Sequence, residues 1–125
     1  MKTINILLGF ILLLITGCQN DEAEISYSVT ATNNFYITRI SFNDSQGGNL
    51  ILPNENLPWN YSFTAAKGYL LKVSANVFSD GTIEIVGTDT LTVIIYVDGV
   101  KFKEEKGLII NGSSDVVTVE GRVSG

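Results

Sequence analysis

Apolar and polar residues alternate with a period of two along most of the chain beyond residue 24. In the segment 25–31, Ile25, Tyr27 and Val29 are separated by single polar residues. Such alternation predicts half-buried β-strands, because successive side chains of a strand point to opposite faces of its sheet. Strands are predicted over residues 25–31, 36–42, 49–52, 60–64, 69–77, 82–86, 91–97, 100–103 and 116–123.

Residues that favour turns separate these segments. Pro53 is predicted to end the strand 49–52, because proline cannot donate a backbone hydrogen bond. The Asp98-Gly99 pair lies directly between two predicted strands. This pair predicts a tight hairpin in which both residues adopt positive φ.

No segment has a helical period with capping residues, so the predicted fold class is all-β. About seven to nine short strands favour an immunoglobulin-like antiparallel β-sandwich formed by residues 25–125. A small closed barrel is the alternative.

The first residues have a different pattern. Lys2 is followed by an almost entirely apolar run over residues 6–15, by two small residues and then by Cys18. This order is typical of a secretory signal peptide. A helix over that run would span only about 15 Å, half of the ~30 Å hydrocarbon core of a bilayer, so it is not predicted to be a permanent membrane span.

The residues Ile15, Thr16, Gly17 and Cys18 together resemble the bacterial lipobox. The resemblance implies that the Cys18 thiol receives diacylglycerol, that signal peptidase II removes residues 1–17, and that the new N-terminus gains a further acyl chain. Several acyl chains anchor a protein stably to a membrane, whereas one chain binds weakly and reversibly. Residues 18–24 are then the lipidated cysteine and an acidic tether. An ordinary secretory signal with an incidental cysteine is the alternative.

Composition excludes several classes of function. The chain has 13 acidic and 8 basic residues, a net charge of −5 and no basic run, which argues against nucleic-acid binding. It has no histidine, and its single cysteine is assigned to the lipid. Thiolate nucleophiles, histidine bases, disulfides and the common zinc ligand sets are therefore excluded. We predict that the protein is not an enzyme and needs no metal or cofactor.

Carboxylates are the remaining candidates for acid–base chemistry. Asp98 is explained by the hairpin turn itself. Glu104 and Glu105 are adjacent, and neighbours on a strand point to opposite faces, so they cannot flank one substrate. We predict a solvated loop for this pair.

Three further features have a structural explanation. Asn43-Asp44-Ser45 with Asn49 offers oxygen ligands for calcium, but it lacks the terminal bidentate glutamate of an EF-hand loop, which favours a polar turn. The pair Gly47-Gly48 lacks the lysine and the following helix of a phosphate cradle. Trp59 and the five tyrosines could stack on a carbohydrate, but their positions in the alternation favour core packing.

Four segments stand in an order that resembles a known family. They are the opening strand 25–30, the glycine-rich hairpin at 47–48, the tripeptide Leu57-Pro58-Trp59 and the segment 95–99, Ile-Tyr-Val-Asp-Gly. Over about residues 25–123 the chain resembles the extracytoplasmic domain of the MmpS family, small membrane proteins named from mycobacteria. Lipoproteins with similar domains occur in Bacteroidota. The resemblance implies an immunoglobulin-like sandwich without catalytic activity, and an accessory role beside MmpL exporters of the resistance-nodulation-division class.

The chain departs from the mycobacterial members in three ways. A lipid replaces their transmembrane helix. Val93 and Val119 stand about where those members carry a cysteine pair, and there are extra residues around 82–90. These departures weaken the implied partnership with an exporter.

An acidic cluster, Asp21, Glu22 and Glu24, follows the cysteine. It resembles the Bacteroidota export signal, which sends lipoproteins to the outer face of the outer membrane. A solvated spacer is the alternative. We expect a non-enzymatic, lipid-anchored binding or assembly module on the outer membrane, exposed at the cell surface, that contacts an envelope protein or an extracellular ligand. The alternative is an MmpS-like accessory factor of an exporter in the periplasm.

Overall fold

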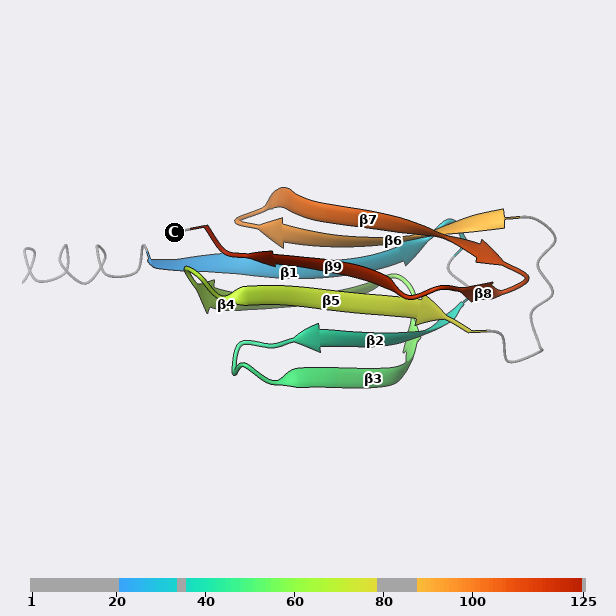
Figure 1. Ribbon diagram of the computed structural model, residues 1–125, viewed down its shortest axis with the longest axis horizontal. Coiled ribbons are helices and arrows are strands. Elements are labelled where there is room, and N and C mark those ends of the chain that lie inside the picture. Colours follow the sequence, from blue (N-terminus) through green and yellow to red (C-terminus); the bar gives the residue numbers. More distant parts are fainter. Residues whose placement is uncertain (1–20, 34–35, 79–87, 125) are drawn as a thin grey trace, which may run out of the picture.

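The structure, a computed structural model, describes residues 21–33, 36–78 and 88–124. These residues form nine β-strands (Figure 1). The predicted strand 82–86 lies outside the described residues. The strands are β1 (Glu22–Ala31), β2 (Ile37–Asn43), β3 (Asn49–Asn56), β4 (Trp59–Ala66), β5 (Leu70–Val77), β6 (Thr88–Val97), β7 (Val100–Ile110), β8 (Ser113–Ser114) and β9 (Val117–Arg122).

The strands pair into two antiparallel sheets. One sheet has the order β4-β1-β6-β7-β8 and the other the order β3-β2-β5-β9. The predicted all-β sandwich is confirmed. Because the described strands divide between two sheets, they do not form the alternative closed barrel. The immunoglobulin-like character of the sandwich stays a prediction.

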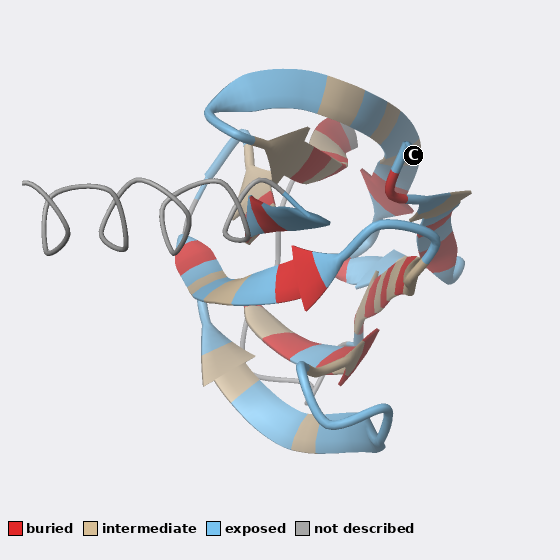
Figure 2. Ribbon diagram, turned by 90° about the vertical axis from the view of Figure 1, so that its left-hand side faces the viewer, coloured by how far each residue is buried: buried red, intermediate tan, exposed pale blue. Residues whose placement is uncertain are grey.

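Alternate residues of the strands fill the space between the sheets. In β1, the side chains of Ile25, Tyr27 and Val29 are fully buried, while the serines between them are half-buried. Figure 2 shows the same striping of buried and exposed positions along other strands. Further fully buried residues come from β5 and β6: Leu71, Val73, Leu91, Val93 and Ile95. The period of two in the sequence thus defines which face of each sheet is apolar.

Aromatic side chains pack β4 against β2. The ring of Phe42 lies 5.3 Å from Trp59 and 4.6 Å from Tyr61, measured between centroids. Tyr27 makes edge contacts with Phe42 and Phe63, at 5.8 and 5.3 Å. Such offset and edge contacts are favourable arrangements for aromatic rings. The predicted core role of Trp59 and the tyrosines is confirmed for Trp59 and for Tyr27, Tyr36, Tyr61 and Tyr69, whereas Tyr96 is not part of the core cluster.

Several strands extend beyond their predicted bounds, and β3 and β7 are extended furthest. β3 continues through Pro53 to Asn56. It lies at the edge of its sheet, where a proline does not have to donate to a further strand. β7 continues to Ile110 and is followed by the turn Asn111-Gly112, whose φ angles are 54° and 77°. Asn-Gly favours a two-residue hairpin as strongly as Asp-Gly does.

The Asp98-Gly99 hairpin is present as predicted, with φ angles of 51° and 79°. A Cβ atom added to Gly99 would meet no atom within 4 Å, so a substitution there acts only through the backbone. Gly99→Val places a β-branched residue at positive φ and is expected to lower the free energy of unfolding by about 1–3 kcal/mol. Chemical denaturation of the chain from Gln19 onward measures this change.

Gly48→Val is the matched control for this prediction. Gly48 is exposed, its φ is not positive, and an added Cβ would make only ordinary contacts with Asp44 at 3.6 Å. An equal loss of stability in the two variants would contradict the conformational explanation.

Candidate functional site

The predicted lipid-attachment residue Cys18 and the lipobox residues Ile15, Thr16 and Gly17 lie outside the described residues. The lipid anchor therefore stays a prediction. The described chain begins at Asp21, close to this segment.

The acidic residues that follow are not an unstructured tether. Glu22 and Glu24 are part of β1 and pair with β4, and the N–H of Lys67 donates to the carbonyl oxygen of Asp21 at 3.1 Å. Ala23 is buried, because the alternation of β1 extends back to it. The predicted start of the first strand at residue 25 is therefore wrong. The side chains of Asp21, Glu22 and Glu24 are all exposed, and their role as an export signal stays a prediction.

Asp98 holds the β6–β7 hairpin against β1. Its Oδ1 accepts a hydrogen bond from the N–H of Glu24 at 2.9 Å. In return, the N–H of Asp98 donates to the carbonyl oxygen of Glu24 at 2.7 Å. These bonds and the positive φ explain the residue without a catalytic role.

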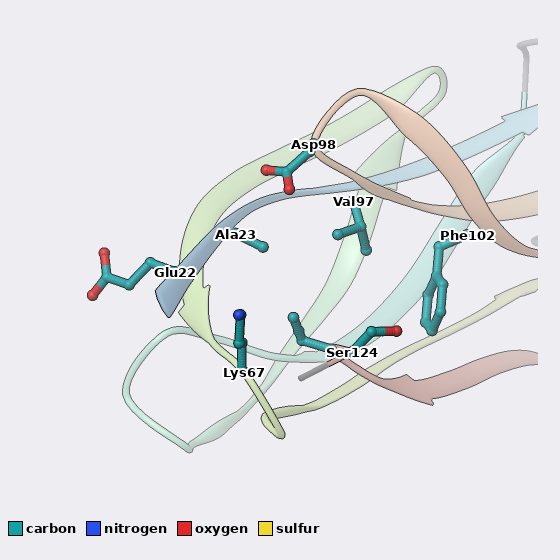
Figure 3. A pocket seen from close by; sticks show the side chains of 8 residues that line it. Glu22, Ala23, Lys67, Val97, Asp98, Phe102 and Ser124 are labelled. Carbon is teal, nitrogen blue, oxygen red and sulfur yellow. The ribbon is translucent and has the colours of Figure 1, made fainter. Parts of the chain in front are cut away.

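A small pocket lies beside this hairpin (Figure 3). Ala23, Val97 and Phe102 contribute apolar walls, and Lys67 and Asp98 lie at its rim. Its volume is about 180 Å³. Sites for small molecules usually have volumes of about 300–1,000 Å³, so we do not assign a ligand to this pocket.

A larger groove lies at the opposite end of the sandwich, between β7 and the residues that lead into β9. Its volume is about 650 Å³. Figure 1 places the ends of β7 and β5 and the short strand β8 here, away from the start of β1. We call it the distal groove. It is lined by Glu105, Lys106, Gly107, Leu108, Ile110, Asp115, Val116, Val117 and Thr118.

The distal groove exposes large apolar side chains. Leu108, Ile110 and Val116 are 60%, 54% and 64% exposed. Ile109, between the first two, is fully buried, so the alternation of β7 directs its neighbours outward. Single exposed apolar residues are common on protein surfaces, but three around one concavity with a charged rim are typical of an interaction surface.

A glycine brings the two walls of the groove together. A Cβ atom on Gly107 would lie 2.5 Å from Cγ2 of Val117, closer than any real contact. The absence of a side chain at Gly107 lets β7 approach β9 at this point. Glu105, Lys106 and Asp115 also line the groove, and because their side chains are exposed we place them at its rim.

The sequence predictions missed this surface. The run Leu108-Ile109-Ile110 gives no sign that only its middle residue is buried. The Asn111-Gly112 pair that follows was the available signal, because it marks the end of a strand and the start of a hairpin.

Among the remaining candidate carboxylates, Glu104 and Asp44 have structural roles. Glu104 and Glu105 lie in β7, not in a loop, and the Nζ of Lys101 forms an ion pair with Glu104 at 3.1 Å. Asp44 Oδ1 accepts hydrogen bonds from the backbone N–H groups of Gln46 and Gly48, at 2.9 and 3.0 Å. The polar turn predicted for this segment is confirmed. Within residues 21–33, 36–78 and 88–124, no group of three or more acidic, cysteine or histidine residues could hold a metal ion.

One buried carboxylate lies near the distal end. Asp89 is 8% exposed, and its Oδ2 accepts hydrogen bonds from the hydroxyl of Tyr36 and from Nδ2 of Asn33, the latter at 3.1 Å. Burial, together with the hydrogen bond to Asp89, raises the pKa of Tyr36 to about 12. The carboxylate thus ties the start of β6 to the connection between β1 and β2.

No protein-family model matches the chain, and no curated protein matches it. The resemblance to the MmpS family stays a prediction. In the part of the chain that the structure describes, no helix is long and apolar enough to cross a membrane.

Proposed function

We propose that the chain is a non-enzymatic binding module of the bacterial envelope, anchored to the outer membrane by lipid on Cys18 and exposed at the cell surface. The observation that carries the binding role is the distal groove, with its three exposed apolar side chains and its charged rim. Protein interfaces combine an apolar centre with a polar rim in this way. The partner is therefore a protein with a complementary apolar projection.

The position of the groove suits an anchored protein. Glu22 lies four residues after Cys18, a distance along the chain that reaches at most about 14 Å, so the lipid would lie near the start of β1. β1 has ten residues and spans about 33 Å, which separates the two ends of the sandwich. An anchor at Cys18 would therefore hold the groove on the side that faces away from the membrane.

The non-enzymatic part of the proposal rests on the side chains that the chain offers. The chain has no histidine, and its single cysteine is assigned to the lipid. The carboxylates of Asp89 and Asp98 accept hydrogen bonds that stabilise the fold.

The groove is tested by photo-crosslinking in intact cells. A photoreactive residue at Ile110 is expected to give an adduct of one defined mass with a partner protein. Leu108→Asp should reduce the yield of this adduct at least tenfold, because complex formation would bury an unpaired carboxylate, at a cost of more than ~1.4 kcal/mol.

Val100 provides the matched control. It is the first residue of the same strand and is 69% exposed. Figure 1 shows the start of β7 at the other end of the sandwich. Val100→Asp should leave the adduct from position 110 unchanged. Equal yields from photoreactive residues at positions 100 and 110, or an adduct that survives Leu108→Asp, would contradict docking in the groove.

A further inference from the structure

The edges of the two sheets differ in how they are protected from further pairing. Among the described strands, β4 and β8 end one sheet, and β3 and β9 end the other. An edge strand presents N–H and carbonyl groups that another chain can bind, and proteins block such edges with charges, proline, bulges or very short strands.

The other edges carry such protection. β3 contains Pro53 and Glu55, and its pairing with β2 shifts register between Thr38 and Ile40. β8 has two residues, and β9 contains Glu120 and Arg122. The part of β7 that β8 does not cover carries five charged residues: Lys101, Lys103, Glu104, Glu105 and Lys106.

β4 has none of these features. Its sequence, Trp-Asn-Tyr-Ser-Phe-Thr-Ala-Ala, contains no charged residue and no proline over eight residues. It pairs with β1 without a register shift from Trp59 to Ala66. Its other side has no neighbouring strand among the described residues.

The hydrogen bonds next to β4 show which of its backbone groups face outward. The N–H of Lys67 donates to the carbonyl oxygen of Asp21, one step beyond the last pair of the β1–β4 ladder. Every second pair in an antiparallel ladder is hydrogen-bonded, so Tyr61, Phe63 and the other odd-numbered residues of β4 bond to β1. The hydrogen bond from the N–H of Asp98 to the carbonyl oxygen of Glu24 agrees with this assignment. It shows that the backbone groups of even-numbered β1 residues face β6, so those of odd-numbered β1 residues face β4.

The N–H and carbonyl groups of Asn60, Ser62 and Thr64 therefore point away from β1, along a free edge. The side chains of these three residues are exposed on the outer face of the sheet. Between them, Tyr61 and Phe63 are half-buried and pack against the core. A strand added here would place alternate side chains beside two aromatic rings and beside a row of small polar groups.

We infer that the edge of β4 binds an extended, uncharged segment of a partner protein as a sixth strand of this sheet. The outward N–H and carbonyl groups of β4 can form a ladder of hydrogen bonds only with an extended polypeptide. Because Tyr61 and Phe63 alternate with polar residues along β4, the added strand should carry apolar residues at every second position. This second interaction surface goes beyond the docking groove of the proposed function.

A second copy of the chain suits this edge less well. A two-fold axis through β4 would pair the two strands antiparallel and place the Glu22 ends at opposite ends of a joint sheet. If both copies were anchored near Glu22 in one membrane, they could pair only with their strands parallel to the bilayer. The two distal grooves would then no longer face away from the membrane. The choice of a foreign segment rests on the proposed anchor.

The test uses the full chain, purified with its lipid in detergent, and a peptide of known sequence. The probe is Ile-Ser-Tyr-Ser-Val-Thr-Ala, the sequence of residues 25–31, of which residues 25–29 already pair with the inner side of β4. The peptide is expected to slow amide hydrogen exchange at Asn60, Ser62 and Thr64 at least tenfold. A peptide of the same composition without alternation should give no protection.

Ser62→Pro removes one outward N–H and no bond to β1, so the fold is retained while peptide protection falls at least tenfold. Ser62→Lys, which keeps the backbone unchanged, is the second blocking variant. Val100→Lys adds the same charge at an exposed position outside β4, and should leave peptide protection unchanged.

In cells, a photoreactive residue at Thr64 should give an adduct with a protein other than this chain, and both Ser62 variants should remove it. Absence of protection at the three amides, or protection that survives both variants, would overturn the inference. So would self-association of the wild-type chain that Ser62→Pro abolishes, because a second copy would then occupy the edge. Leu108→Asp should not affect peptide protection, so this inference and the docking groove can fail separately.

Discussion

Replacing Cys18 with alanine is expected to abolish palmitate labelling of the chain and to leave an uncleaved precursor. Cys18 is the only cysteine, so no other thiol can accept diacylglycerol. The lipobox resemblance implies that lipid attachment precedes cleavage. The variant cannot be lipidated, so residues 1–17 should be retained. Metabolic labelling with palmitate and the size of the product on a denaturing gel measure both effects.

Gly17→Ala is the matched control for this change. It keeps a small residue directly before Cys18, which a signal-peptide cleavage site requires. Both labelling and cleavage should be retained. A Cys18→Ala protein of mature size, or palmitate labelling that persists in it, would contradict the lipid anchor.

The same cells test where the domain is located. Antibody against the folded domain should label unpermeabilised cells that express the wild-type chain. Labelling only after permeabilisation would contradict surface display and would favour the periplasmic, exporter-accessory alternative. The exposed side chains of Asp21, Glu22 and Glu24 remain accessible to an export factor even though β1 begins within this cluster.

Local patterns in the sequence were sufficient to predict the all-β sandwich. A period of two identifies the buried face of strands such as β1 and β5, and the Asp98-Gly99 turn follows from two residues that tolerate positive φ. The start of β1 was missed because Ala23, between two glutamates, is a weak apolar signal. Its burial depends on contact with the rest of the core, which is a tertiary effect.

The interaction surfaces were harder to predict, since they depend on which strands become neighbours. Leu108 and Ile110 are apolar residues that would be buried if β7 had a further sheet above it. The free edge of β4 follows from the order β4-β1-β6-β7-β8, and strand order cannot be read from alternation. The sequence of β4 does show that this strand has no charged residue and no proline over eight residues, so it would be unprotected if it lay at an edge.

Alkaline pH is expected to destabilise the fold through two buried tyrosines. Burial raises the pKa of Tyr27 and of Tyr36, and the hydrogen bond to Asp89 adds to the increase for Tyr36, which reaches about 12. Both groups have a folded pKa above the unfolded value of 10.0. Their neutral forms therefore stabilise the fold fully below pH 10, and this contribution is lost as the pH rises toward the folded pKa.

For Tyr36 the expected loss between pH 10 and pH 12 is roughly 2 kcal/mol, because a difference of one pKa unit corresponds to about 1.4 kcal/mol and the change is spread over the whole range between the unfolded and folded pKa values. Tyr27 adds to the slope over the same range. Chemical denaturation at a series of pH values measures the free energy of unfolding directly. Tyr36→Phe should give a shallower decrease, because phenylalanine cannot ionise.

At pH 7, Tyr36→Phe should itself cost about 1–3 kcal/mol, because the buried carboxylate of Asp89 loses the hydrogen bond that the Tyr36 hydroxyl donates. Tyr96→Phe is the control at this pH, since its hydroxyl makes no hydrogen bond with the residues that the structure describes.

Asp89→Asn distinguishes the contribution of the hydrogen bond from that of the carboxylate charge. It removes the negative charge that disfavours the Tyr36 tyrosinate, so the loss of stability at alkaline pH should be smaller. It keeps an acceptor for the Tyr36 hydroxyl, so the free energy of unfolding at pH 7 should change less than in Tyr36→Phe. An alkaline slope that is the same in wild type and Tyr36→Phe would mean that the Tyr36 hydroxyl is not held by Asp89 in the folded protein.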